Sequence, residues 1–112
     1  DYIIKKLNNE NNTRRAVISL FNPFHDTKEE HIPCLNHIQF QKHDNNLYMT
    51  TLFRSNDIGI AFHSNALALI KLGEIVAEKT NCNLRNYVHH INNAHIYIYR
   101  DKDMLKHHFN FE

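Results

Sequence analysis

The feature that most constrains this fold is a pair of β-rich segments, 32–41 and 47–54, separated by a short polar run. That run, His43-Asp44-Asn45-Asn46, supplies the residue types that close β-hairpins. Along the second segment, alternation places largely apolar residues on both faces, which is typical of a central strand rather than an edge strand. We therefore expect an antiparallel hairpin at the middle of a sheet.

One strong helical pattern follows the hairpin, over residues 65–79, with Ser64 or Asn65 as a suitable N-cap. Weaker patterns predict a short helix near the start, a strand over 16–21, a polar loop over 22–31, a strand over 87–99 and a helix beginning at 101. The order of strand, hairpin, helix and strand predicts an α+β layer.

Composition narrows the class of protein. The chain has 112 residues with no internal repeat or linker, so we expect residues 1–112 to form a single domain. Thirteen Lys and Arg against twelve Asp and Glu leave a net charge of +1, which indicates neither a nucleic-acid nor a membrane partner. Two cysteines are too few for a disulfide framework and favour a reducing compartment, so we expect a cytoplasmic protein. Because the chain opens on Asp1 and ends on a patterned stretch, we expect it to be a portion of something longer.

Several residues could carry chemistry. Cys34 is either a small buried hydrophobe or a nucleophile. Ten histidines invite a metal site, but no CxxC, HxxxH or HExxH spacing occurs, so we expect no metal. Arginine pairs suit a phosphate, because the guanidinium fork meets its oxygens bidentately. Three polar clusters stand out, each of which could equally be a solvated pair, a strand-end cap or ring packing: Arg14-Arg15, Arg54-Ser55-Asn56-Asp57 and His95-Ile96-Tyr97.

These pieces occur in an order that resembles a known family. From Thr13 to about Leu105 the chain is similar to the C-terminal half of thymidylate synthase, the archaeal type above all. The matching pieces are Arg14-Arg15-Ala16-Val17-Ile18-Ser19-Leu20-Phe21-Asn22-Pro23, Pro33-Cys34, Gln39-Phe40, Leu47-Tyr48-Met49, Phe53-Arg54-Ser55-Asn56-Asp57, Asn65 and Ala94-His95-Ile96-Tyr97.

The resemblance implies a fold and an activity. The fold would be a thymidylate synthase-like mixed β-sheet with a central buried helix, and the sheet would pack against a partner subunit. The activity would be that of a methyltransferase, which converts dUMP to dTMP by reductive methylation with 5,10-methylenetetrahydrofolate or a related reduced folate or pterin. The partners would be dUMP, the folate and a second copy in a homodimer.

The resemblance also assigns roles. Cys34 would be the catalytic nucleophile that adds to C6 of the pyrimidine. Asp57 would lie near both the pyrimidine and the folate, and Asn65 would read the base edge. The other positions would bind the nucleotide: Arg54 and Ser55 its phosphate, Arg14 and Arg15 the phosphate in the neighbouring subunit's site, and His95 and Tyr97 the deoxyribose hydroxyl.

Two alternatives stay open. A hydroxymethylase of the same superfamily would act on dCMP or CMP, but Asp is expected at the base-reading position of such an enzyme, and Asn65 favours uracil. A non-catalytic nucleotide-binding remnant is the second alternative, because the family's N-terminal half and closing tail are not in these residues. If Asn65 selects uracil, neighbours must hold its amide in one orientation, and His63 and Asn93 are the candidates.

Overall fold

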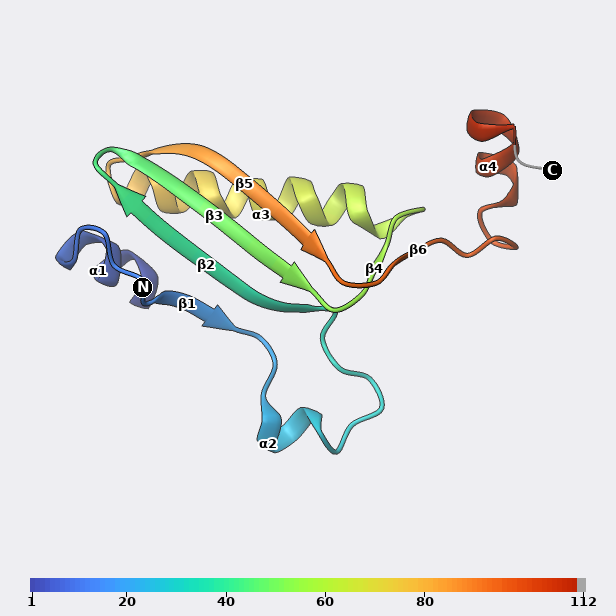
Figure 1. Cartoon of the computed structure of the whole chain (residues 1–112), viewed down its shortest axis with the longest axis horizontal. Helices are drawn as coiled ribbons and strands as arrows, with labels where there is room; N and C mark the ends of the chain where they lie inside the picture. Colours follow the sequence, from blue (N-terminus) through green and yellow to red (C-terminus); the bar gives the residue numbers. More distant parts are fainter. Residues whose placement is uncertain (111–112) are drawn as a thin grey trace.

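The computed structural model describes residues 1–110, and its centre is a four-stranded mixed sheet with a long helix across one face (Figure 1). The strand order is β1-β2-β3-β5. The first three strands pair antiparallel, and β5 runs parallel to β3. The strands are β1 (Ala16–Ser19), β2 (Leu35–His43), β3 (Asn46–Phe53) and β5 (Asn83–Ile91).

The expected hairpin is present. Strands β2 and β3 pair from His43 opposite Asn46, so the connecting loop contains only Asp44 and Asn45. Asp44 has a φ of 53°, a left-handed conformation that short polar residues tolerate. Strand β3 lies between β2 and β5, which confirms that it is central.

Helix α3 (Ala61–Lys79) connects the hairpin to the parallel strand β5 and packs on the sheet. Parallel neighbours need such a crossover, because a short turn cannot return the chain to the same end of the sheet. The side of α3 that faces the sheet is buried, whereas Leu67 and Ile75 on other sides are exposed. The core between helix and sheet is formed by Ile38, Phe40, Leu47, Met49, Phe53, Leu69, Val76 and Ala77.

Shorter elements surround this layer. Helix α1 (Tyr2–Asn9) buries Ile3 and Leu7 against the core. Helix α2 is a single turn (Pro23–Asp26) inside the segment expected to be a loop, and Asn22 caps it by accepting a hydrogen bond from the Phe24 amide. Two-residue strands β4 (Asn56–Asp57) and β6 (Ala94–His95) pair in parallel, and α4 (Lys102–Phe109) follows. The α2 segment and α4 project from the sheet layer (Figure 1).

Two expectations about element boundaries were wrong. Helix α3 begins at Ala61, four residues before the expected start, and Ile60 is its N-cap without a side-chain hydrogen bond. The strand expected over 87–99 begins at Asn83 and ends at Ile91, which pairs with Phe53, the last residue of β3. Beyond that pair β3 offers no further partner, so the chain bends at Asn92 and continues to β6.

The helices have no membrane-spanning character. Within residues 1–110, none combines the length and the apolar composition needed to cross a bilayer.

Candidate active site

A cleft of about 610 Å³ opens where the end of β3, strands β4 and β6 and the first turns of α3 meet. Loop and strand-end residues from distant parts of the chain converge there, because the parallel β4–β6 pair holds residues 56–57 beside residues 94–95. Seven of the nine predicted site residues line the cleft, namely Cys34, Arg54, Ser55, Asp57, Asn65, His95 and Tyr97.

Cys34 is exposed in this cleft, directly before strand β2, and is not the buried hydrophobe that its alternative interpretation predicted. The guanidinium of Arg54 donates to its sulfur, with 3.7 Å between Nη2 and Sγ. The same guanidinium donates to the carbonyl oxygens of Pro33 and Ile32, both at 2.9 Å. A positive charge therefore lies against the thiol and also holds the loop that carries it.

The backbone strengthens this arrangement. The amide of Arg54 donates to the carbonyl oxygen of Cys34 at 2.9 Å and to Oδ1 of Asn36 at 2.8 Å. The register of β2 and β3 shifts between Leu35 and His37, as it does at a β-bulge. A bulge next to a strand end redirects a side chain, and here it accompanies the turn of Cys34 toward the cleft.

The second polar cluster contacts the third inside the cleft. Ser55 Oγ and His95 Nδ1 are 3.3 Å apart. The rings of His95 and Tyr97 meet edge to face, with centroids 5.2 Å apart. Although the expected strand ends at Ile91 and does not reach these two rings, the segment from β6 to Tyr97 still brings them together.

An ion-pair network centred on Arg100, at the rim of the cleft, was not predicted from the sequence. Arg100 contacts Asp57, with 2.7 Å between Nη2 and Oδ2, and forms a bidentate pair with Asp101 through Nε and Nη2. The hydrogen bonds from Arg100 lower the pKa of Asp101, and those two carboxylates raise the pKa of Arg100. Gly59 makes room for the pair, since a Cβ there would collide with the Asp101 carboxylate. The adjacent opposite charges at 100–101, directly after the aromatic run, were the available signal.

Asn65 is held by a neighbour that was not among the candidates. Asn56, which is 3% exposed, donates from Nδ2 to Oδ1 of Asn65 at 3.2 Å. His63 is exposed, and neither His63 nor Asn93 lines the cleft; the backbone carbonyl of Asn93 accepts from the Asn56 amide, and its backbone N–H donates to the Arg54 carbonyl. The expectation that His63 or Asn93 fixes the amide was therefore wrong. Asn56 belongs to a cluster that the sequence had already singled out, but without a role.

A partly buried histidine, His89, contacts Asn56. His89 Nε2 is 2.8 Å from Oδ1 of Asn56, and its Nδ1 is 2.5 Å from the hydroxyl of Tyr87. Its ring stacks on Phe53 at 4.4 Å between centroids and meets the edge of Phe62 at 4.9 Å. Burial lowers the pKa of His89 below its usual 6.5, so the ring is neutral at neutral pH.

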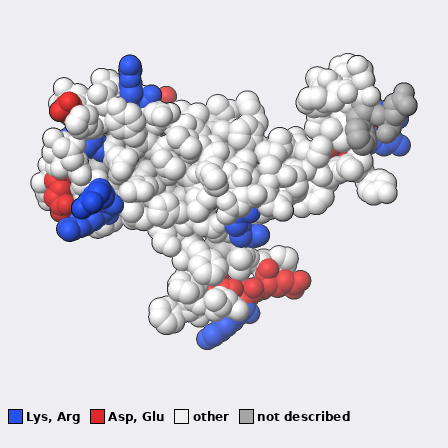
Figure 2. Space-filling model, in the orientation of Figure 1, with Lys and Arg blue, Asp and Glu red and all other residues white. Residues whose placement is uncertain are grey.

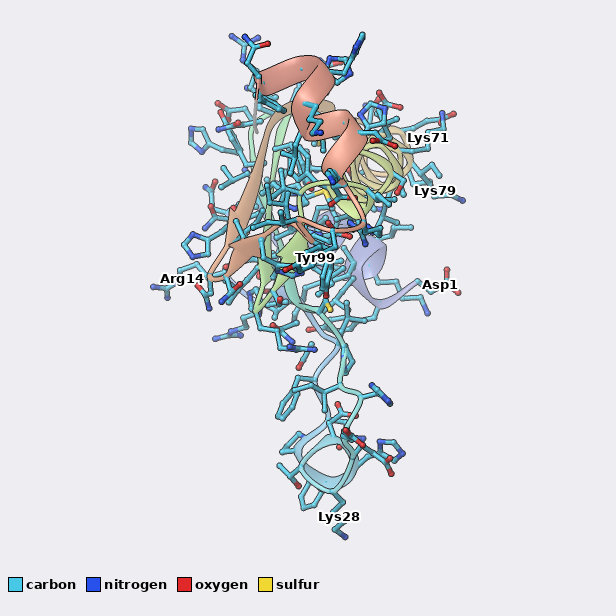
Figure 3. The ribbon with its side chains drawn as sticks, turned by 90° about the vertical axis from the view of Figure 1, so that its right-hand side faces the viewer. Asp1, Arg14, Lys28, Lys71, Lys79 and Tyr99 are labelled. Carbon is cyan, nitrogen blue, oxygen red and sulfur yellow. The ribbon has the colours of Figure 1, made fainter. Side chains whose placement is uncertain are left out.

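Arg14 and Arg15 lie outside the cleft. Both are exposed, directly before strand β1. Figure 3 shows Arg14 pointing away on the side of the sheet opposite Lys71 and Lys79 of helix α3. The two arginines thus cannot serve the cleft of their own chain in this arrangement.

The sequence model of the family described as "Thymidylate synthase" matches residues 1–110. A protein of Methanocaldococcus jannaschii named "Putative thymidylate synthase" is 46% identical over 114 residues, which are 97% of this chain and 51% of that protein. A protein of the same name from Methanosarcina barkeri is 38% identical over 106 residues, 95% of this chain and 48% of that protein.

Solved structures include one of similar fold. The thermostable thymidylate synthase A from Bacillus subtilis superposes with a TM-score of 0.87 and 28% sequence identity, covering 100% of this chain and 40% of that one. The match confirms the predicted α+β fold. The chain spans about half the length of the curated relatives that it matches.

Proposed function

This chain belongs to the thymidylate synthase family, and on that premise we propose that it carries the nucleophile and most nucleotide contacts of an enzyme that methylates dUMP to dTMP. The observation that carries the proposal is the thiol of Cys34 beside the Arg54 guanidinium, in one cleft with an amide, a histidine and a tyrosine suited to a nucleotide. We propose residues 1–112 as a single domain that corresponds to the C-terminal catalytic portion of such an enzyme.

The proposed nucleotide site uses the cleft from end to end. Arg54 spends two of its nitrogens on backbone carbonyls and on Cys34, yet a guanidinium has five N–H donors, which leaves capacity for a phosphate together with the hydroxyl of Ser55. His95, which lies next to Ser55, would bind the deoxyribose hydroxyl together with Tyr97. Asn65 would pair with the base edge through its donor and its acceptor.

Cys34 is proposed to attack the bound pyrimidine. Its thiolate would add to C6, and the electron pair of the C5–C6 double bond would then make C5 nucleophilic toward a one-carbon unit. The cation at 3.7 Å and the exposure of the sulfur support this role, since reactive cysteines lie in electropositive, accessible surroundings.

The co-substrate proposed is 5,10-methylenetetrahydrofolate or a related reduced pterin, which when bound supplies the one-carbon unit and its reducing hydride. Asp57 suits this ligand class, because its carboxylate lines the cleft and can accept hydrogen bonds from ring N–H groups. Arg100 keeps that carboxylate oriented by its ion pair. Among residues 1–110, no group of three or more His, Cys, Asp or Glu side chains is placed to hold a metal.

A homodimer is proposed as the working assembly. Residues 1–110 leave the face of the sheet away from α3 uncovered, and the middle of that face is almost free of Lys, Arg, Asp and Glu (Figure 2). The alternation along β3 and β5 places side chains such as Tyr48, Leu52 and Val88 on that face. Because Arg14 projects on the same side, a twofold partner against this face would receive Arg14 and Arg15 near its own phosphate. We propose the cytoplasm as its compartment, since an exposed free thiol persists where thiols stay reduced.

The test is capture of the nucleotide in a covalent complex. In the full-length protein, wild type should form a stable adduct with 5-fluoro-dUMP and methylenetetrahydrofolate, seen as a mass shift, and Cys34→Ala should form none. Cys82→Ala is the matched control, because Cys82 lies outside the cleft and its thiol donates to the Thr80 carbonyl. An adduct on the Cys34→Ala protein would remove Cys34 from this role.

A further inference from the structure

Four polar side chains form a continuous chain of hydrogen bonds that ends in the cleft. It runs from Tyr87 to His89, from His89 to Asn56 and from Asn56 to Asn65, with separations of 2.5, 2.8 and 3.2 Å. Asn65 and Asn56 line the cleft together with Cys34, whereas His89 and Tyr87 lie on strand β5 and do not line it.

The donors and acceptors of these four side chains fix the direction in which the hydrogen bonds run. The oxygen Oδ1 of Asn56 can only accept, so Nε2 of the neutral His89 ring carries the hydrogen. Nδ1 is then the unprotonated nitrogen and accepts the hydrogen of the Tyr87 hydroxyl. Stacking on Phe53 and the edge contact with Phe62 hold the ring in this orientation.

From this arrangement we infer that His89 and Asn56 are positioning residues that hold the Asn65 carboxamide in one orientation and so make the cleft select uracil over cytosine nucleotides. The inference rests on the proposed function, in which Asn65 reads the base. With one lone pair of Oδ1 committed to Asn56, Asn65 still presents an N–H donor and one free lone pair. These match the O4 acceptor and the N3–H donor of uracil.

Cytosine presents the reverse pattern, a donor at N4 and an acceptor at N3. To bind it, Asn65 would have to rotate by 180° and bring its NH₂ group against the NH₂ group of Asn56. Relief of that clash would require Asn56 to rotate as well and His89 to move its hydrogen to Nδ1. The Tyr87 hydroxyl would then accept from Nδ1 and lose the ring nitrogen as the acceptor of its own hydrogen. Because leaving a buried donor unpaired is costly, we expect wild type to bind dUMP at least roughly tenfold more tightly than dCMP.

The first experiment measures the direction of these hydrogen bonds in the absence of a nucleotide, from the nitrogen of His89 that carries the hydrogen. In the full-length protein labelled with ¹⁵N, the ring shifts of His89 should show hydrogen on Nε2 and none on Nδ1. Hydrogen on Nδ1, or rapid exchange between the two forms, would overturn the inference even if every variant failed to fold.

The second experiment reverses the polarity at one position. Asn56→Asp replaces the donor that faces Asn65 by an oxygen, so Asn65 should rotate and the ratio of dissociation constants for dUMP and dCMP should move at least tenfold toward dCMP. His89→Phe keeps the stacking on Phe53 but removes both nitrogens, and should reduce the preference without reversing it. Asn93→Asp is the matched control, since it adds the same charge near the cleft on an exposed residue and should leave the ratio unchanged.

The outcomes distinguish failure of the positioning role from failure of the proposed function. If wild type prefers dUMP and Asn56→Asp leaves the ratio as it was, the positioning role is wrong and the proposed function stands. If Asn56→Asp weakens both nucleotides equally, its role is structural and the inference is again overturned. If wild type does not bind dUMP, the proposed function fails and takes the inference with it.

Discussion

Side chains in this cleft form hydrogen bonds with the backbone as well as with one another. Arg54 donates to two carbonyl oxygens of the loop before Cys34 and also reaches the sulfur. One residue therefore shapes the loop and sets the charge around the thiol. A lysine at this position would lose the planar fork that makes these contacts simultaneously, although it would keep the charge.

The His89 ring predicts how stability depends on pH. Its pKa is lowered in the folded state because burial penalises the charged ring, whereas the unfolded chain titrates near 6.5. As the pH falls below 6.5 the unfolded state takes up a proton that the folded state refuses, so the free energy of unfolding decreases. The loss ends once the pH is below the folded pKa.

We expect this acid-side loss to be smaller in His89→Phe, which has no group to protonate there. Urea unfolding of the full-length protein at pH 7.5 and pH 5.5 measures both, and His108→Phe, at an exposed position in helix α4, is the control. An equal loss in wild type and His89→Phe would contradict the prediction.

The Arg100 ion pairs predict a second pH effect with a different window. The pKa of Asp101 is lowered from 3.8, mainly by its hydrogen bonds with Arg100, so the pair stabilises the fold above about pH 3.8 and that contribution is lost as the pH falls through the folded pKa. We expect Arg100→Met to be less stable than wild type at pH 6, with a difference that shrinks below pH 3.8. Lys106→Met, a substitution in α4 outside this network, should change stability little at either pH.

At the scale of elements, the contact between α3 and the sheet depends on a glycine. A Cβ at Gly73 would lie 2.9 Å from Met49 Sδ and 3.0 Å from a Leu84 methyl carbon. Glycine inside a helix costs about 1 kcal/mol relative to alanine, so its presence here reflects how closely helix and strands approach. The helix propensity of α3 and its packing therefore make opposite demands at this position.

We expect Gly73→Leu to reduce the free energy of unfolding by about 1–3 kcal/mol, because the buried space has no room for the added carbons. Ala68→Leu is the matched control, since Ala68 lies on an exposed side of the same helix and should change stability by less than about 0.5 kcal/mol. Urea unfolding of the full-length protein measures both. Equal stability of the two variants would show that the helix can move away from the sheet at no cost.

Residues 1–110 form a layer in which one face of the sheet is covered and the other is bare. Helix α3 covers the first, and the second carries few charges across its middle. Arg14, which lies outside the cleft, projects on the bare side, and Arg15 is the next residue along the chain. This asymmetry makes the proposed homodimer testable by an experiment that uses two inactive proteins.

We expect full-length Cys34→Ala and the double variant Arg14→Ala/Arg15→Ala to be nearly inactive alone and to regain activity when subunits are exchanged. With twofold symmetry, half of a random mixture would be heterodimers with one intact site each, so roughly a quarter of wild-type activity should return. No recovery, in a mixture shown by sedimentation to contain dimers, would place Arg14 and Arg15 outside the neighbouring site.

Sequence patterns were sufficient to predict the main helices and strands and most of the polar residues that line the cleft. The hairpin and its two-residue turn, the central strand and the long helix follow from alternation, helical spacing and polar turn residues, because these depend on neighbours along the chain. The cluster from Arg54 to Asp57 and the pair His95 and Tyr97 were recognisable for the same reason: each is a local run of polar residues.

Tertiary structure alone decided where elements end and which side chains support the site. Strand β5 stops at Ile91 because β3 ends at its partner Phe53, a limit set by a strand almost forty residues earlier. The contacts of Arg100 with Asp57 and of Asn56 with His89 join residues 43 and 33 positions apart. No periodicity reports such contacts, because a hydrogen bond between distant residues depends on how packed layers place their side chains and not on spacing along the chain.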